Sequence, residues 1–87
     1  MITLSPVFQQ TRQEQQLSYR KLAAALGCSH QQAKNYCTRG HRPELKRVES
    51  WMDSPLPWLR DLGYRVFGIL YRPLVRAIAD QLDEAAQ

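Results

Sequence analysis

The stretch LAAALGCSHQQAKNYCTRGHRP, residues 22–43, constrains the fold more than any other part of the chain. It begins as a helix-forming run, and Gly27 is predicted to end that helix, because a helix C-terminus often needs a left-handed residue that glycine adopts at little cost. A second helical run follows at once, with Ser29 as the predicted N-cap and Gly40 as its end. The stretch therefore predicts two short helices joined by a tight turn.

One further helix is expected before this pair. Ser5 as N-cap and Pro6 in the first turn predict a helix that runs to about Gln16. Ser18 is the predicted N-cap of the helix that ends at Gly27. The inner faces of the helices before Gly40 are expected to carry the apolar or small residues that recur three or four positions apart: Val7, Phe8, Thr11, Leu22, Ala23, Leu26, Ala33, Tyr36 and Cys37.

Two more helices are expected after the pair. Pro43 is predicted to open a fourth helix, whose inner face would carry Leu45, Val48, Trp51 and Met52. The proline-rich junction DSPLPW then leads to a fifth helix, which Pro73 must kink or split in two. Because no segment alternates with period two, the chain is expected to be all-α.

Length and composition limit the classes of protein to which this chain can belong. Its 87 residues predict one small core, and no apolar run is long enough to cross a membrane. The N-terminal segment has no basic region followed by an apolar block, so we expect a cytoplasmic protein without a membrane anchor. The two cysteines are too few for a disulfide framework and are expected to be reduced thiols.

The net charge of +4 is distributed unevenly. Residues 1–43 hold six basic groups against one acidic group, Glu14, which gives +5, whereas residues 44–87 hold six basic and seven acidic groups, which gives −1. A basic half beside a near-neutral half favours contact with a polyanion, although charge alone is equally compatible with a solvated basic surface.

The second helix of the pair carries many polar side chains. Two short helices joined by a glycine-containing turn form a helix-turn-helix, in which the second helix lies in the major groove of DNA. Glutamine and asparagine can each form two hydrogen bonds with an adenine edge, and lysine can reach guanine or phosphate. No carboxylate occurs from Cys28 to Pro43, whereas an ordinary exposed helix mixes both signs of charge. The pattern therefore favours DNA contact over a solvated helix surface.

These residues resemble the helix-turn-helix domains of the Cro and cI phage repressors, often called the XRE type. The resemblance covers roughly residues 7–58 and depends on the combined spacing of Ala23, Gly27, Ala33, Gly40 and Pro43. It implies an all-α fold, a lambda-repressor-like five-helix domain with a helix-turn-helix and an added C-terminal helical extension. The DNA-binding domain is expected over residues 1–58 and the extension over residues 59–87. The resemblance also implies that double-stranded DNA is the partner.

The resemblance assigns roles to particular side chains. Base contacts would come from the start of the second helix of the pair, at His30, Gln31, Gln32, Lys34 and Asn35. Phosphate contacts would come from Tyr19, Arg20, Ser29, Arg39, His41 and Arg42. Two positions depart from the family pattern: Tyr19 stands where glutamine is usual, and Cys37 stands where an acidic residue is common.

Other kinds of site are weakly supported. Cys28, His30, Cys37 and His41 contain zinc-ligand types, but their spacing does not match that of a zinc finger, which separates two close ligand pairs by a longer loop. A Cys–His nucleophile pair lacks an orienting third group and an oxyanion donor. We therefore expect no metal, no cofactor and no enzymatic activity.

An apolar stripe in the C-terminal extension has three possible roles. It could wrap the domain as core, form the interface of a homodimer that binds two half-sites, or bind a second protein. The residues expected at a dimer or partner interface are Leu59, Leu62, Val66, Phe67, Ile69, Leu70, Leu74 and Ile78.

Two functional hypotheses follow from these patterns. The first is a sequence-specific transcriptional regulator, most simply a phage- or plasmid-type repressor that binds an operator as a homodimer. The second is a protein-interaction module on a helix-turn-helix scaffold, which would bind a host regulator, a polymerase subunit or a toxin. The basic N-terminal half favours the first hypothesis.

Overall fold

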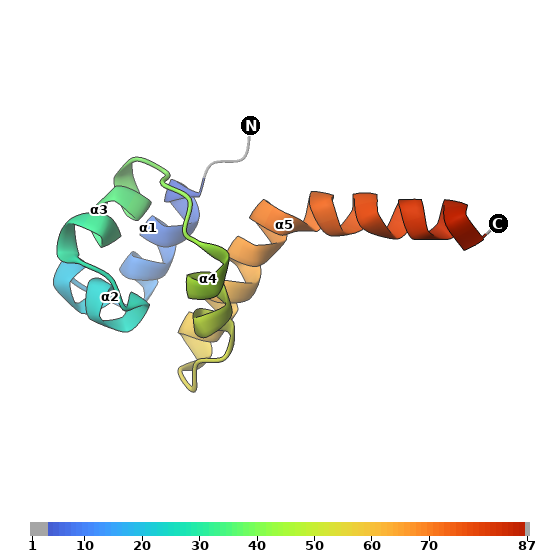
Figure 1. Cartoon of the computed structure of the whole chain (residues 1–87). Coiled ribbons are helices and arrows are strands. Elements are labelled where there is room, and N and C mark those ends of the chain that lie inside the picture. Colours follow the sequence, from blue (N-terminus) through green and yellow to red (C-terminus); the bar gives the residue numbers. More distant parts are fainter. Residues whose placement is uncertain (1–3, 87) are drawn as a thin grey trace.

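The computed structural model describes residues 4–86, with the side chains of residues 4–73 and 76–83. Within this range the chain is all-α, as expected, and contains no strand. Figure 1 shows four short helices gathered with the first part of a long fifth helix into one body. The helices are α1 (Ser5–Glu14), α2 (Tyr19–Leu26), α3 (His30–Thr38), α4 (Leu45–Met52) and α5 (Pro57–Ala86).

The boundaries of α2 and α3 are confirmed as predicted. The hydroxyl of Ser18 accepts a hydrogen bond from the backbone N–H of Lys21, and the hydroxyl of Ser29 accepts one from that of Gln32. Gly27 ends α2 with φ of 75°, and Gly40 follows α3 with φ of 64°. Both glycines therefore have the left-handed conformation that their positions require.

Two boundaries of α1 differ from the prediction. Leu4 takes the N-cap position without a side-chain hydrogen bond, and Ser5 is already the first helical residue. The reason is that the side chain of Leu4 packs in the core, and its backbone already has helical dihedral angles. The helix therefore begins one residue earlier than predicted. At the other end, α1 stops at Glu14 because Gln16 has φ of 53°, a left-handed value that a helix cannot include.

The start of α4 also differs from the prediction. Pro43 lies before the helix and is buried, and Glu44 takes the N-cap position in an extended conformation. The prediction that Leu45 belongs to the inner face was wrong, since it is 42% exposed. Leu45 lies in the first turn of α4, whereas Val48 and Trp51 are buried on the inner face of the helix, as predicted.

Three aromatic rings form the centre of the core. Phe8 of α1 stacks on Tyr36 of α3 with ring centroids 5.1 Å apart, and the edge of Trp51 of α4 meets both rings. All three side chains are fully buried. Such pairs contribute roughly 0.5–1.5 kcal/mol each beyond their area burial. The cluster therefore fixes α3 against α1 and α4.

The first part of α5 belongs to this core. Leu59, Leu62 and Val66 are buried in the same cluster as Phe8 and Trp51. The predicted division of the chain after residue 58 therefore falls inside the core, because α5 packs against α4 and α1.

The helix α5 continues through Pro73. Figure 1 shows it changing direction near its middle, after which its distal part projects from the body. Pro73 has no N–H to donate to the carbonyl of Ile69, which is the usual cause of a bend one turn before a proline. Of the two alternatives predicted at Pro73, a kink or a split into two helices, this arrangement agrees with the kink, because α5 remains one helix.

A glycine allows the close approach of α4 and α5. A Cβ atom at Gly63 would lie 2.8 Å from the backbone nitrogen of Met52 and 3.0 Å from Cβ of Trp51. By contrast, a Cβ atom at Gly68, on the same helix, would meet nothing within 4 Å.

We predict that Gly63→Ala lowers the free energy of unfolding by about 1–3 kcal/mol, because the two helices must move apart. Gly68→Ala is the matched control and should be neutral or stabilising by up to about 1 kcal/mol, since alanine favours a helix over glycine. Urea unfolding at one protein concentration measures both. Equal stability of Gly63→Ala and the wild type would contradict the close packing of α4 on α5.

Candidate nucleic-acid interface

The turn between α2 and α3 is held by backbone hydrogen bonds. The N–H groups of Gly27 and Cys28 both donate to the carbonyl oxygen of Ala23, at 2.9 and 3.1 Å. The indole N–H of Trp51 donates to the carbonyl oxygen of Leu26 at 2.9 Å, in a buried position. The carbonyl groups at the end of α2 thus accept hydrogen bonds both from the turn and from α4. These bonds hold α3 at a fixed angle to α2.

The helix α3 has one buried face and one exposed face. Ala33, Tyr36 and Cys37 face the core. On the other side His30, Gln31 and Lys34 are exposed, and Asn35 is half-buried. The amide of Gln31 donates to the side-chain oxygen of Asn35 at 3.1 Å, which aligns these two side chains one turn apart. Four of the five predicted base-contacting residues therefore lie together on or beside the free face of α3.

The fifth, Gln32, is engaged elsewhere. Its side-chain oxygen accepts a hydrogen bond from the Arg47 guanidinium at 2.9 Å, and the same Nη1 atom lies 3.4 Å from the hydroxyl of Tyr36. Arg47 belongs to α4, so this contact ties the start of α3 to the next helix. Sequence reasoning missed Arg47, because nothing in the spacing of α4 distinguishes it from Lys46. Gln32 is thus oriented by α4, and its amide N–H groups remain available to another partner.

Most of the predicted phosphate-contacting residues are exposed near α3. Arg39, His41 and Arg42 lie exposed in the segment after α3, and Arg20 lies exposed in the first turn of α2. The hydroxyl of Ser29 caps α3 as an acceptor, so its own proton remains available to donate. Lys21 is also exposed beside Arg20 and was not among the predicted residues, although its place in the first turn of α2 was a signal for it.

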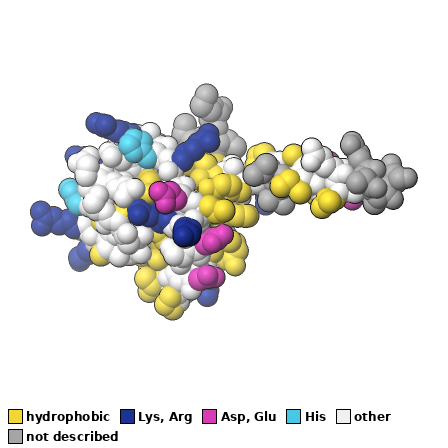
Figure 2. Space-filling model, viewed as in Figure 1, with side chains coloured by type: hydrophobic (Ala, Val, Ile, Leu, Met, Phe, Trp, Pro, Cys, Tyr) yellow, Lys and Arg dark blue, Asp and Glu magenta, His cyan; other side chains and the backbone are white. Residues whose placement is uncertain are grey.

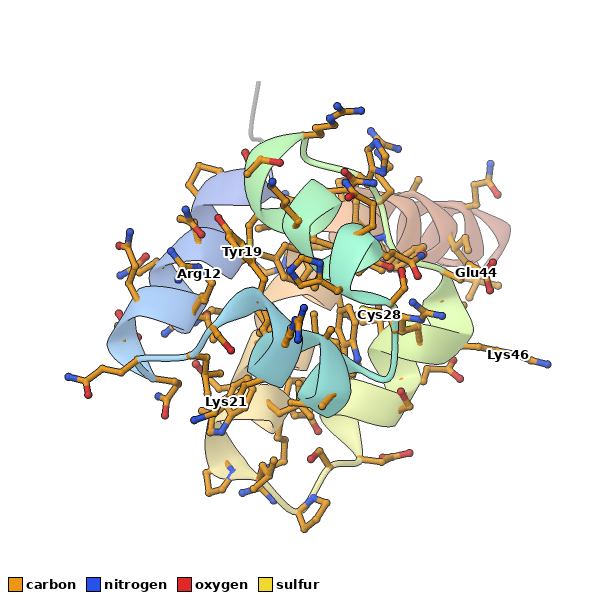
Figure 3. The ribbon with its side chains drawn as sticks, turned by 90° about the vertical axis from the view of Figure 1, so that its left-hand side faces the viewer. Arg12, Tyr19, Lys21, Cys28, Glu44 and Lys46 are labelled. Carbon is orange, nitrogen blue, oxygen red and sulfur yellow. The ribbon has the colours of Figure 1, made fainter. Side chains whose placement is uncertain are left out.

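Tyr19 is held more tightly than a free phosphate ligand would be. The Arg12 guanidinium lies 4.6 Å from the centroid of its ring, and its hydroxyl accepts a hydrogen bond from Gln9 at 3.5 Å. The Tyr19 ring meets that of His30 edge-on with centroids 6.3 Å apart. Figure 3 shows Arg12 and Tyr19 together beside α1, on the side of the molecule that faces the viewer. Tyr19 thereby joins α1 to the starts of α2 and α3.

The charge on this end of the molecule is predominantly positive. Within the described residues 4–43 the sole acidic side chain is Glu14, at the end of α1. Figure 2 shows Lys, Arg and His side chains over the end of the body formed by α2 and α3, with Asp and Glu side chains toward α4. The exposed face of α3 is therefore flanked by cations, which suits a polyanionic ligand.

The two cysteines are not activated. Burial raises the pKa of the Cys28 thiol, with the nearby Arg47 opposing that rise, and burial also raises the pKa of the Cys37 thiol. A nucleophilic cysteine needs the opposite shift. Among residues with described placement, no three His, Cys, Asp or Glu side chains gather in a way that could hold a metal ion.

Three residues predicted at a dimer or partner interface are buried in the core of their own chain. Leu59, Leu62 and Val66 are at most 4% exposed and pack in the core, so the prediction of an interface role for them was wrong. The first half of the stripe faces inward because α5 covers α1 and α4. Phe67, Ile69 and Leu70 are half-buried against the same core, Ile78 is exposed, and the side chain of Leu74 lies outside the described residues.

Comparisons of the chain with models of protein families, with curated proteins and with solved structures give no match. Within the described part of the chain, no helix combines the length and apolar character needed to cross a membrane.

Proposed function

We propose that this protein is a sequence-specific double-stranded DNA-binding regulator, of the type of the phage and plasmid repressors. The observation that carries the proposal is the free face of α3, where amide, imidazole and ammonium side chains lie exposed and the helix itself has no carboxylate. This composition matches the requirements of a helix that reads base edges in the major groove.

Base readout is assigned to the exposed start of α3. Gln31 and Asn35 present aligned amide groups, and Lys34 lies on the same exposed side. An amide can both donate to and accept from an adenine edge, which gives sequence preference. Gln32 is assigned a supporting role, because Arg47 holds its oxygen and so positions the start of α3.

Phosphate contact is assigned to exposed cations on both sides of α3. Arg20 and Lys21 lie at the start of α2, and Arg39 and Arg42 lie after α3. The N-termini of α2 and α3 add backbone N–H groups and a favourable dipole for an anion. These contacts would set the register of the protein on the duplex without carrying sequence information.

The regulatory mechanism in this proposal is occlusion of the promoter. A bound α3 in the major groove of an operator blocks polymerase access to the overlapping promoter. A single α3 covers too few base pairs for useful discrimination, so we include a homodimer on two half-sites about one helical turn, roughly 34 Å, apart.

We predict that DNA affinity falls steeply with salt, because bound phosphates release counterions. Arg42→Ala should weaken binding to random and preferred duplex about equally and should lower the salt slope by about 1. Arg76→Ala, the same change of charge on the projecting part of α5, is the matched control and should leave the slope unchanged. Gel-shift titrations at two salt concentrations measure both variants. An affinity that is independent of salt, or the absence of binding, would refute the proposal.

Gln31→Ala should remove a base contact while leaving the phosphate contacts in place. We predict a loss of about 1–3 kcal/mol on a duplex selected by the wild type and a much smaller loss on random duplex. Gln81→Ala, an exposed glutamine on the projecting part of α5, is the control. Selection from a random duplex library, followed by titration, gives both numbers. If Gln31→Ala and His30→Ala select the same sequence as the wild type, α3 is not the reader.

A further inference from the structure

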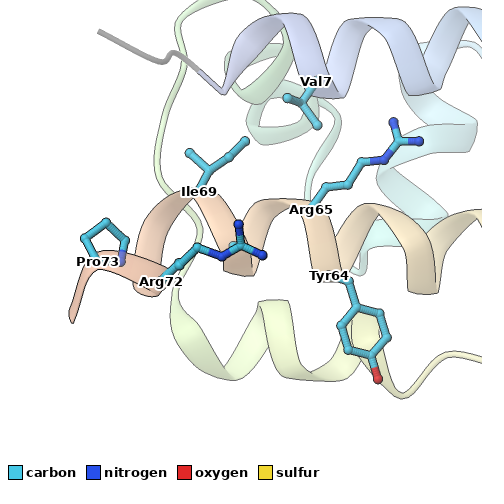
Figure 4. Close-up of a pocket in the computed structure, with 7 residues that line it drawn as sticks. Val7, Tyr64, Arg65, Ile69, Arg72 and Pro73 are labelled. Carbon is cyan, nitrogen blue, oxygen red and sulfur yellow. The ribbon is translucent and has the colours of Figure 1, made fainter. Parts of the chain in front are cut away.

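A groove lies where α5 bends, beside α1. Figure 4 shows Val7 of α1 and Ile69 of α5 at one side of it, and Arg65 and Arg72 extend from α5 beside them. Its volume is about 620 Å³. Of the described residues that line it, none belongs to α2 or α3. This feature, which we call the elbow groove, is therefore separate from the candidate nucleic-acid interface.

Four residues of α5 surround one hole in the elbow groove. They occupy positions i, i+3, i+4 and i+7 and so share one face of the helix: Arg65, Gly68, Ile69 and Arg72. In knobs-into-holes packing, such a set of four residues receives one side chain, the knob, of a second helix. The hole therefore has the layout that a partner helix requires.

Gly68 keeps this hole open. A Cβ atom at Gly68 would meet nothing within 4 Å, whereas one at Gly63 would lie 2.8 Å from the backbone of α4. Glycine inside a helix is unfavourable relative to alanine. The close packing of α4 on α5 explains Gly63, but no contact among the described residues explains Gly68. A partner side chain that fills the hole would explain it.

The hole is apolar on one side and positively charged at both ends. Val7 and Ile69 are half-buried and supply the apolar surface. Arg65 and Arg72 are exposed, each about one helical turn from the centre of the hole. Arg65 pairs with Asp61 through its Nε atom at 3.1 Å, and its terminal amino groups can still donate to a second carboxylate. The hole therefore suits an apolar side chain flanked by carboxylates.

We propose that the elbow groove binds an acidic amphipathic helix of another protein. One apolar side chain of that helix enters the hole, and carboxylates one turn before and one turn after it meet Arg65 and Arg72. Positions one turn before and after a helical residue lie on the same face as that residue, so the partner presents the knob and both charges together. This is recognition of a helix in a groove, with the charges fixing its register.

A second copy of this chain does not supply that helix. Among the described residues, the large apolar side chains that are exposed are Leu45, Leu56, Tyr64, Ile78 and Leu82. None of them has an Asp or Glu three or four positions away on both sides. The required combination of knob and charges therefore comes from a different protein. Because the groove lies outside the candidate nucleic-acid interface, the inference does not rest on DNA binding and can be tested without DNA.

The probe is a synthetic alanine-rich helix of about 20 residues, a length at which a helix persists in water. It carries one leucine, with glutamates three and four positions before and after it. Three comparison peptides have lysines in place of the glutamates, alanine in place of the leucine, or the four glutamates moved two and five positions from the leucine, to the opposite face. Nuclear magnetic resonance of the ¹⁵N-labelled full-length chain at low salt measures binding of each peptide.

The glutamate peptide should shift the amides of Val7 and residues 64–72 most. Each comparison peptide should bind at least about tenfold more weakly, because it lacks the knob, the charges or their common face. The peptide with moved glutamates has the same composition and net charge as the probe, so it separates docking in the hole from general attraction to a basic protein.

Two variants test the hole itself. Gly68→Leu fills the hole and should weaken binding at least about tenfold, while its fold persists because leucine favours a helix and the position is open. Ala79→Leu adds the same side chain at an exposed position of α5 outside the groove and should bind like the wild type.

Charge reversal is the second test. Arg65→Glu with Arg72→Glu should lose the glutamate peptide and bind the lysine peptide instead, since the charges at both ends of the hole are then acidic. Arg60→Glu with Lys46→Glu, two exposed cations outside the groove, has the same change of charge and should keep the wild-type preference. Circular dichroism checks that each variant is folded.

Three results would overturn the proposal. The first is the absence of shifts with about 1 mM glutamate peptide, since binding weaker than this is not specific recognition. The second is a set of shifts confined to α2 and α3, which would show that the peptide only mimics the charge of DNA. The third is equal binding by Gly68→Leu and the wild type, which would place the peptide outside the hole.

Discussion

The hydrogen bond from the Trp51 indole to the carbonyl of Leu26, 2.9 Å long and buried, is the interaction on which the rest of the structure depends. Leu26 is the last residue of α2, where a helix leaves its carbonyls without partners. A buried carbonyl without a partner would cost about 1–3 kcal/mol. Because the donor comes from α4, the turn between α2 and α3 is secured by a helix that follows it in sequence. The stacked rings of Phe8 and Tyr36 complete this junction.

The fixed junction determines which side chains of α3 remain free. Ala33, Tyr36 and Cys37 are committed to the core, and the opposite face of α3 is left to solvent. Arg47 adds a second tie, since its guanidinium bonds Gln32 at the start of α3. The polar side chains that remain exposed, Gln31 and Lys34 among them, are thus presented from a rigid helix, and this lowers the cost of ordering them on a ligand. We infer that this presentation is what makes the face suited to base readout.

Local chemistry made part of this structure predictable from sequence. The caps at Ser18 and Ser29 and the left-handed glycines at 27 and 40 depend on a few neighbouring residues, and they were predicted correctly. Features that depend on distant partners were not. The Gln32–Arg47 contact spans 15 positions, and no periodicity in either helix indicates it. The stripe on α5 was predicted, but its inner half, from Leu59 to Val66, was assigned to an interface because apolar spacing does not say which chain covers it. The exposed side chains of α3 were predicted as a group, whereas their DNA-binding role remains a proposal.

The central claim is that the exposed face of α3 and the cations beside it bind DNA. Nuclear magnetic resonance of the ¹⁵N-labelled chain, titrated with a short random duplex at low salt, tests it most directly because each amide reports separately. We predict the largest shifts at the N-termini of α2 and α3, along the exposed side of α3 and at residues 39–42. The amides of residues 76–83 should not shift. Shifts confined to α5, or none at any duplex concentration, would contradict the account.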